Sequence, residues 1–309
     1  MERLLITLIL VCTMNNITNA QNPFYGQYHT PHEAVPFDRI ETEHYEPAIL
    51  EGIRLQNAEI EAIIQNPEKA DFTNTIEAFD ESGELLDRVV AVFGNMLSAE
   101  TNDDLQELAQ KIMPLLSEHS NNITLNEKLF ARVKEVYNQK EALQLTQEQK
   151  QLLENAYNSF VRHGANLEGE AREEYRRLTT ELSKLTLTFS ENNLKETNAY
   201  QMLLTKKESL AGLPEIIIEA AAETAKSEGK EGWAFTLHAP SYIPFMTYSD
   251  NRDLRQKLYM AYNTKCTHDN EFNNIDIVKK IANTRMKIAQ LLGYKDYAEY
   301  TLKKRMAEN

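Results

Sequence analysis

The chain contains few residues that interrupt helices and few that could cross-link it. Its 309 residues include 10 glycines, 9 prolines and 2 cysteines. So little glycine and proline argues against an all-β or disordered chain, in which turns and breaks are frequent. Cys12 lies in an amino-terminal apolar run, and removal of that run would leave Cys266 without an internal partner. The fold must therefore be stabilised by its apolar core and not by disulfides.

Positive charge is also scarce. Lys and Arg number 33 against 47 Asp and Glu, which gives a net charge of −14. An acidic surface repels phosphate backbones, so we expect no nucleic-acid partner. Hydrophobic residues make up 42% of the chain and charged residues 26%, as in ordinary globular proteins. Leu, Ala, Glu, Lys and Gln are abundant, and these residues favour helix.

No short motif assigns a chemistry to this sequence. A phosphate-binding glycine loop, a nucleophile elbow and a Cys-x-x-Cys pair are all missing, and no two histidines have the spacing of a zinc helix. His29, His32 and Glu33 suggest a metal site, but Pro36 would break the helix needed to present them. His238, expected in a loop after a strand, is either a functional or an ordinary surface histidine. We therefore predict no catalytic and no metal-binding residue, and substrate-binding residues stay unassigned.

The first twenty residues have the layout of a secretory signal peptide. Arg3 precedes an apolar run over residues 4–12, and small residues end at Ala20, which predicts cleavage between Ala20 and Gln21. The run is too short to anchor the chain in a bilayer. We expect the mature chain to be exported and not to remain attached to the membrane after the signal peptide is removed. It would be located in the periplasm or, alternatively, outside the cell. A lipoprotein interpretation of Cys12 is disfavoured by the bulky valine before it.

Residues 147–193 are the most regular stretch of the sequence. Apolar side chains recur there every three or four positions, as on one face of a helix. Thr146 and the glutamine three residues later form a capping box. Gly164 and the glycine five residues later interrupt the pattern, and Gly164 suits a left-handed helix cap. We predict one helix from 147 to about 163 and a second from about 168 to 193.

On either side of this stretch the pattern predicts further short elements. Before it we expect an extended arm over 21–39, then helices over 43–65, from an N-cap at Asn74 to 97, from Asn102 with a kink or end at Pro114, and from Asn126 to 137. After it we expect paired strands over 199–205 and 233–237, a helix over 214–226 and a loop between Pro240 and Pro244. Two further helices are expected, one from an N-cap at Asp250 to 262 and one over 275–292. A last helix from Asp296 is expected to be cut off at Asn309, so the chain looks truncated.

Eight segments of the sequence resemble, in order, those of one protein family. They are FTNTIEA at 72–78, NEKLFARV at 126–133, FVRHGANL at 160–167, GLP at 212–214, the segments 233–240 and 251–262, LLGY at 291–294 and RMA at 305–307. Each is weak alone, but their common order is specific. The chain resembles the thimet oligopeptidase family of zinc metallopeptidases, and looks most like bacterial peptidyl-dipeptidases (dipeptidyl carboxypeptidases) and oligopeptidase A.

The resemblance implies a mainly α protein in which two lobes flank a deep channel that admits only short, unfolded peptides. This chain would form one wall, as a multi-helix lobe with a small β-hairpin around 199–205 and 233–237. In the family, a His-Glu-x-x-His helix and a downstream glutamate bind zinc, and the motif glutamate activates water. This sequence ends before such a motif, so no catalytic or metal residue can be transferred to it.

We therefore interpret residues 1–20 as a signal peptide and 21–309 as the amino-terminal helical lobe of an exported zinc metallopeptidase, a peptidyl-dipeptidase or an oligopeptidase. Alone, the chain should be inactive and hold no zinc. Its expected partners are short peptides and the missing carboxy-terminal catalytic lobe, and the complete protein is expected to be a monomer. Apolar surface should be exposed near Leu302 and Met306. The alternative is a non-catalytic helical binding or scaffold domain.

Overall fold

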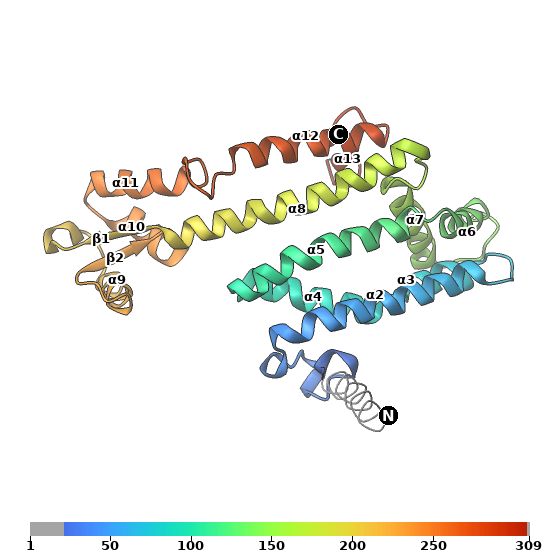
Figure 1. Cartoon of the computed structure of the whole chain (residues 1–309), viewed down its shortest axis with the longest axis horizontal. Coiled ribbons are helices and arrows are strands. Elements are labelled where there is room, and N and C mark those ends of the chain that lie inside the picture. The colour runs from blue at the N-terminus through green and yellow to red at the C-terminus, as the bar shows by residue number, and fades with distance from the viewer. Residues whose placement is uncertain (1–21, 308–309) are drawn as a thin grey trace, which may run out of the picture. The chain divides into compact units, whose positions relative to one another are not determined.

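A computed structural model describes residues 22–307, which are mainly helical and include one two-stranded sheet (Figure 1). Their contacts divide them into two compact units. The first unit comprises the residues up to Ser183 and those from Lys287 on, and the second unit comprises Lys184 to Met286. The expected signal peptide, with its cleavage after Ala20, lies outside the described residues. Between residues 22 and 307, no helix combines the length and apolar character needed to cross a membrane.

The helices and strands have the following bounds, where η marks a 3₁₀ turn or, for η4, a π-helix. They are η1 (Pro23–Tyr25), η2 (Pro31–Glu33), η3 (Phe37–Arg39), α2 (Thr42–Gln65), η4 (Phe72–Glu77), α3 (Ala78–Asp80), α4 (Glu84–Ala99), α5 (Asp103–Thr124), α6 (Glu127–Asn138), α7 (Gln147–Arg162), α8 (Gly169–Ala199), β1 (Gln201–Leu204), η5 (Lys207–Leu210), α9 (Glu215–Ser227), β2 (Trp233–Thr236), α10 (Ala239–Tyr248), α11 (Arg252–Asn263), α12 (Ile275–Leu291) and α13 (Tyr297–Leu302). The mainly α class expected from the sequence is confirmed.

The predicted central helix pair is confirmed as α7 and α8. The Gln149 backbone N–H donates to Thr146 Oγ1 at 3.3 Å, and the Thr146 N–H donates to Gln149 Oε1 at 3.1 Å, which completes the capping box. Gly164 has φ of 87°, and the N–H of Ala165 donates to the Phe160 carbonyl at 3.0 Å. This hydrogen bond is that of a helix end capped by a left-handed glycine. The second helix, α8, continues six residues beyond the predicted end.

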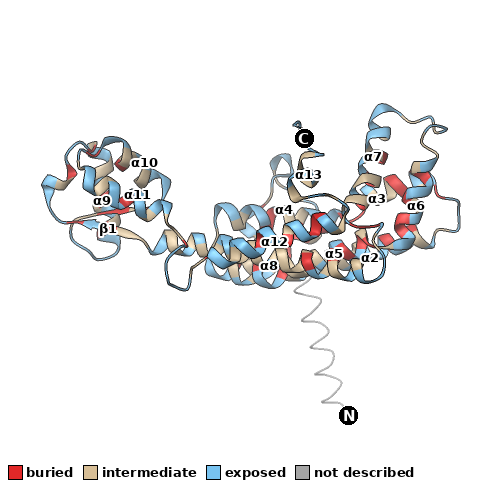
Figure 2. Cartoon of the chain, turned by 90° about the horizontal axis from the view of Figure 1, so that it is seen from above, coloured by how far each residue is buried: buried red, intermediate tan, exposed pale blue. Residues whose placement is uncertain are grey.

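The main apolar core of the first unit combines aliphatic side chains with aromatic rings on η4, α3, α6 and α7. Phe160 is 1% exposed, and its ring centroid lies 5.3 Å from that of Phe79 and 5.8 Å from that of Phe130. The rings of Tyr137 and Tyr157 stack at 3.8 Å. Figure 2 shows the buried positions on α6 and α7. Sequence-distant helices are thus joined by side chains that periodicity alone assigns to the inside.

Two sequence expectations in the first unit were wrong, and one of the two alternatives at Pro114 is excluded. Asp71, not Asn74, is the N-cap, since Asp71 Oδ1 accepts from the Asn74 N–H at 2.7 Å. The helix expected from 74 to 97 is interrupted at Gly83, whose φ is 86° and whose N–H donates to Glu59 Oε2 at 2.8 Å. A partner on α2 therefore stabilises a break that local propensity did not reveal. At Pro114, where a kink or an end was expected, α5 does not end but continues to Thr124.

Both ends of the described chain also differ from expectation. The arm over 21–39 contains three short 3₁₀ turns, and Phe24 is fully buried, with its ring 5.4 Å from that of Tyr45. An apolar anchor therefore fixes a segment that lacks periodicity. At the other end α13 begins after its predicted cap, Asp296, but it stops at Leu302 and is not cut off at Asn309.

The second unit has a smaller core around the predicted strand pair. The two strands are antiparallel, with Gln201 opposite Thr236 and Leu204 opposite Trp233, so this prediction is confirmed. Phe235 and Phe245 are fully buried, and their ring centroids lie 4.6 Å apart. The hairpin thus packs against α10 through one edge-to-face aromatic pair.

The loop expected between Pro240 and Pro244 was wrong, because these residues lie inside α10. Pro240 occupies the first turn, where its missing N–H leaves no intrahelical bond unmade. Burial of Phe245 in the core stabilises the turn that follows. The predicted cap of α11 was wrong by one residue, since Asn251 Oδ1 accepts from the Leu254 N–H at 3.1 Å.

Candidate functional site

The histidines noted in the sequence do not gather into one site. His29, His32 and Glu33 are exposed in the amino-terminal arm, and His238 lies exposed at the N-cap of α10. His119, by contrast, is 7% exposed, and its Nε2 lies 2.7 Å from Gln56 Oε1. Within residues 22–307, no three His, Cys, Asp or Glu side chains converge as a metal centre requires. These residues therefore do not form a zinc site.

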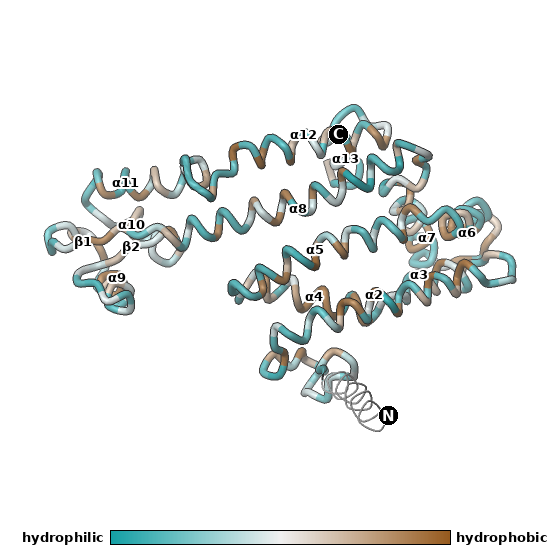
Figure 3. Tube along the Cα trace, viewed as in Figure 1, coloured by the Kyte–Doolittle hydropathy of each residue, from teal (hydrophilic) through white to brown (hydrophobic). Residues whose placement is uncertain are grey.

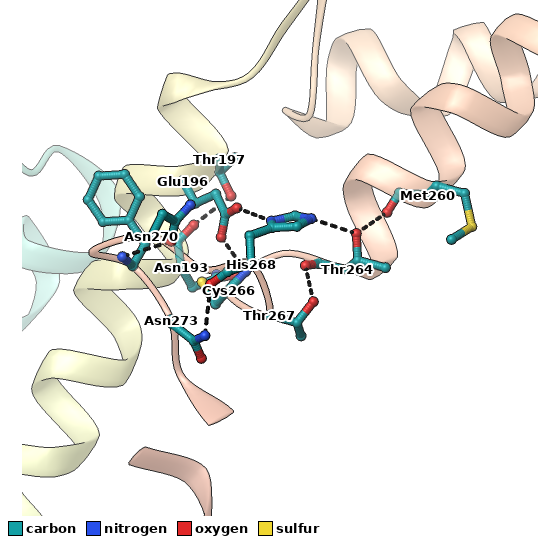
Figure 4. A network of polar contacts seen from close by, with 11 residues as sticks. Asn193, Glu196, Thr197, Met260, Thr264, Cys266, Thr267, His268, Asn270 and Asn273 are labelled. Carbon is teal, nitrogen blue, oxygen red and sulfur yellow. Dashed lines mark hydrogen bonds and ion pairs between the residues drawn. The ribbon is translucent and has the colours of Figure 1, made fainter. Parts of the chain in front are cut away.

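Glu196 on α8 is an ionisable group of the second unit with several polar partners. Its side chain is 12% exposed, and its carboxylate accepts hydrogen bonds from the backbone N–H of Cys266 and from His268 Nδ1, the latter at 2.6 Å (Figure 4). Burial raises the pKa of Glu196, but the donors from His268 and Cys266 outweigh this effect and hold the pKa below its usual value. A charged carboxylate therefore joins α8 to the loop between α11 and α12.

Cys266 is held in an uncommon backbone conformation beside this carboxylate. Its φ is 59°, a left-handed value that costs a non-glycine residue of the order of 1 kcal/mol. Hydrogen bonds on both sides offset that cost, because the Cys266 N–H donates to Glu196 and its carbonyl accepts from the Asn274 N–H at 2.7 Å. Burial and the nearby carboxylate raise the pKa of the Cys266 thiol to about 11. The thiol is therefore protonated at neutral pH and is a poor nucleophile.

The other nitrogen of His268 continues the network. Its Nε2 lies 3.2 Å from Thr264 Oγ1, while the Thr264 hydroxyl donates to the Met260 carbonyl at 2.7 Å. The Thr264 hydroxyl proton is therefore directed at the Met260 carbonyl and not at the imidazole ring. The hydroxyl, imidazole and carboxylate occur in the order of a catalytic triad, but the hydroxyl is not poised to lose its proton to the ring.

Further contacts fasten the same loop to α8. Lys265 Nζ donates to Thr197 Oγ1 at 3.0 Å and lies 4.5 Å from the ring centroid of Tyr262. The side-chain amide of Asn274 donates to the Phe189 carbonyl at 2.9 Å. The arrangement fixes the loop over residues 264–274 and supplies charge complementarity. These contacts make the group a structural junction between α8 and this loop.

Little in the amino-acid sequence indicates this junction. Glu196 lies 70 residues before Cys266 and 72 residues before His268, so no local motif connects them. The only local sign was a polar stretch after α11 that carries the lone cysteine of the mature chain and a histidine. Periodicity does not detect such a site, because it reports which residues face the core and not which polar groups meet.

The first unit contains a concave feature between the amino-terminal parts of α2 and α5. It is an open groove of about 1120 Å³. Its lining includes Glu41, Glu43, Glu46, Asp104 and Glu107, with Leu50 and Leu108 between them. Lys111 Nζ bonds Glu46 at 2.5 Å. The groove is acidic, and none of its lining residues was predicted as a site residue.

Comparison with known proteins confirms the resemblance stated from the sequence. Residues 245–309 match the model of Peptidase family M3. The chain is 36% identical over 288 residues to dipeptidyl carboxypeptidase of Escherichia coli K12, and the aligned region covers 93% of this chain and 42% of that protein. It is 33% identical over 278 residues to oligopeptidase A of Haemophilus influenzae, where the alignment covers 89% of this chain and 41% of the relative. It is 31% identical over 284 residues to oligopeptidase A of Escherichia coli K12, where the alignment covers 91% of this chain and 42% of the relative. The chain thus spans about two fifths of the length of these relatives.

Proposed function

We propose, from the relationship of this chain to the thimet oligopeptidase family (peptidase family M3), that it is the amino-terminal part of an exported zinc metallopeptidase that hydrolyses short peptides. The observation that carries the proposal is the alignment of 93% of this chain with 42% of a dipeptidyl carboxypeptidase. Its relatives are named either dipeptidyl carboxypeptidase or oligopeptidase A. The parent is therefore a peptidyl-dipeptidase or an oligopeptidase.

In this proposal the present chain contributes a wall of the substrate channel and no catalytic group. Residues 22–307 bring no three potential ligands together, so zinc would be held by the remaining part of the parent. Bound zinc would supply a water activated near neutral pH. The helices described above would restrict access to that water, so that short peptides enter and folded proteins do not.

The function is tested with two proteins, the 309-residue chain and the product of its complete reading frame. Both are assayed on a short internally quenched peptide, without additive, with a chelator, and with zinc restored after chelation. We expect cleavage by the complete product only, loss of cleavage with the chelator and recovery with zinc. Chelator-sensitive cleavage by the 309-residue chain would refute the proposed division of labour.

The alternative is a helical binding or scaffold domain without catalysis. It is supported by the lack of converging metal ligands or of an activated nucleophile in the described part of the chain. A complete product that has no His-Glu-x-x-His motif, or that lacks chelator-sensitive activity, would favour this alternative. Export is tested separately, by sequencing the amino terminus of the protein from its native host. A mature chain beginning at Gln21 is expected, and retention of Met1 on soluble cytoplasmic protein would contradict export.

A further inference from the structure

Helix α12 is apolar on two separate faces. At about 100° per residue, the positions 275, 278, 282 and 286 fall within an arc of roughly 80°. Ile275, Val278 and Met286 on this arc are 39%, 48% and 42% exposed, and Ala282 is exposed as well. We call these four residues the outer stripe. Figure 3 shows apolar residues recurring along α12.

The other sides of α12 are those of an ordinary surface helix. Its inner face is buried through Ile281, Thr284 and Ile288, while the buried Ala289 lies beyond the end of the outer stripe on the same arc. A third arc carries the exposed charged residues Asp276, Lys279, Lys280 and Lys287. A helix at a protein surface needs only one apolar face, whereas a helix that is apolar on two faces packs between two neighbours. The outer stripe therefore lacks the layer that its composition predicts.

The neighbouring helix α11 exposes apolar side chains of the same kind. Tyr259 and Met260 are 50% and 49% exposed, and Tyr262 is 39% exposed. Tyrosine and methionine are enriched in the buried centres of protein interfaces. Both helices lie within residues 245–309, the stretch that matches the peptidase family model. The exposed apolar residues therefore concentrate where this chain carries the beginning of a peptidase domain.

We propose that the outer stripe of α12 is the docking surface for a later segment of the same polypeptide, an amphipathic helix with apolar residues at three- and four-residue spacing. This inference rests on the proposed function. It is supported by the share of the relatives that this chain leaves uncovered, since it aligns with only 42% of the dipeptidyl carboxypeptidase. A tethered segment is also present at high effective concentration, so that a narrow stripe can hold it without a second copy.

The test measures the reactivity of thiols introduced on two arcs of α12. Met286→Cys and, as a second reporter, Val278→Cys probe the outer stripe, and Lys280→Cys on the charged arc is the matched control. Each variant is made in the 309-residue chain and in the complete product, and circular dichroism verifies folding. Labelling at each site by a maleimide is followed by peptide mass spectrometry, which separates the introduced thiols from Cys12 and from the buried Cys266.

We expect both stripe thiols to react at least about tenfold more slowly in the complete product, because burial removes them from water. The Lys280→Cys thiol should react at nearly the same rate in both proteins. The proposal would be overturned if each of the three thiols reacted at the same rate in the 309-residue chain and in the complete product. It would also be overturned by a complete reading frame that ends at Asn309. Protection that appears in the 309-residue chain only as its concentration rises would also overturn it, because the occupant would then be a second copy.

This readout does not depend on catalysis. A complete product that protects the stripe but hydrolyses no peptide would leave the docking surface standing and refute the proposed function. A complete product that hydrolyses peptides while the stripe thiols stay reactive would support the proposed function and refute the docking surface.

Discussion

The two compact units are held together by different kinds of interaction. In the first unit, the rings of Phe79, Phe130 and Phe160 pack into an apolar core shared by several helices. In the second unit, one aromatic pair supports the strand pair, and a partly buried carboxylate, Glu196, ties a loop to α8. Apolar packing is nearly non-directional and independent of pH, whereas the carboxylate needs its donors in place and its charge retained. The units should therefore respond differently to mutation and to acid.

The largest expected effect is in the aromatic core of the first unit. Phe160→Ala should lower the free energy of unfolding by about 3–5 kcal/mol, because it leaves a cavity between two rings. Phe37→Ala, at a side chain that is 50% exposed, is the control and should change stability by less than about 0.5 kcal/mol. Urea denaturation measures both, and hydrogen exchange locates the change. Equal loss of protection in β1 and β2 would show that the units do not unfold separately.

Helix packing in the first unit is probed by two glycines. A Cβ at Gly52 would lie 2.8 Å from the backbone Cα of Leu86, so Gly52→Ala should force α2 and α4 apart and cost roughly 1–3 kcal/mol. A Cβ at Gly94 meets nothing within 4 Å in the described chain, so Gly94→Ala should stabilise α4 by up to about 1 kcal/mol. Thermal melts of both variants test the pair. Opposite signs are expected, and a neutral Gly52→Ala would contradict this close approach.

The junction of the second unit is tested by Glu196→Gln. Loss of the carboxylate should cost about 1–3 kcal/mol and increase hydrogen exchange in residues 264–274, while α6 and α7 stay protected. The sign with pH follows from the lowered pKa of Glu196 in the folded state. Its contribution is present above the ordinary value of 4.5 and is lost as pH falls through the lower folded-state value. Acid titration of exchange in this loop should show that loss in the parent chain and not in Glu196→Gln.

The smallest effect concerns a buried histidine of the first unit. Burial lowers the pKa of His119 below its ordinary value of 6.5, so the folded chain resists protonation there. Stability from the neutral ring is therefore present above 6.5 and falls as pH drops through the folded-state value. Urea midpoints at about pH 7.5 and pH 5.5 should differ less in His119→Gln than in the parent chain. An unchanged difference would assign the pH dependence of this unit to other groups.

Several features were determined by the sequence alone, because they depend on neighbours along the chain. The capping box at Thr146 and the left-handed Gly164 set the bounds of the central helices, and their residues lie within a few positions of one another. The strand pair around Met202 and Phe235 was also predictable from the sequence, because short apolar runs bounded by turn residues indicate strands. Helical periodicity likewise placed Phe160 and Tyr175 inside. Local physics suffices for such elements.

Other features were decided only by the tertiary structure. The break at Gly83 depends on Glu59 of another helix, and α10 forms through its prolines because Phe245 is buried in a core that the hairpin completes. The junction at Glu196 joins groups 70 or more residues apart, and the outer stripe of α12 is distinguished from a core face only by its exposure. A directional contact between distant residues leaves no periodic trace in the chain, because its free energy depends on distances that exist only after folding.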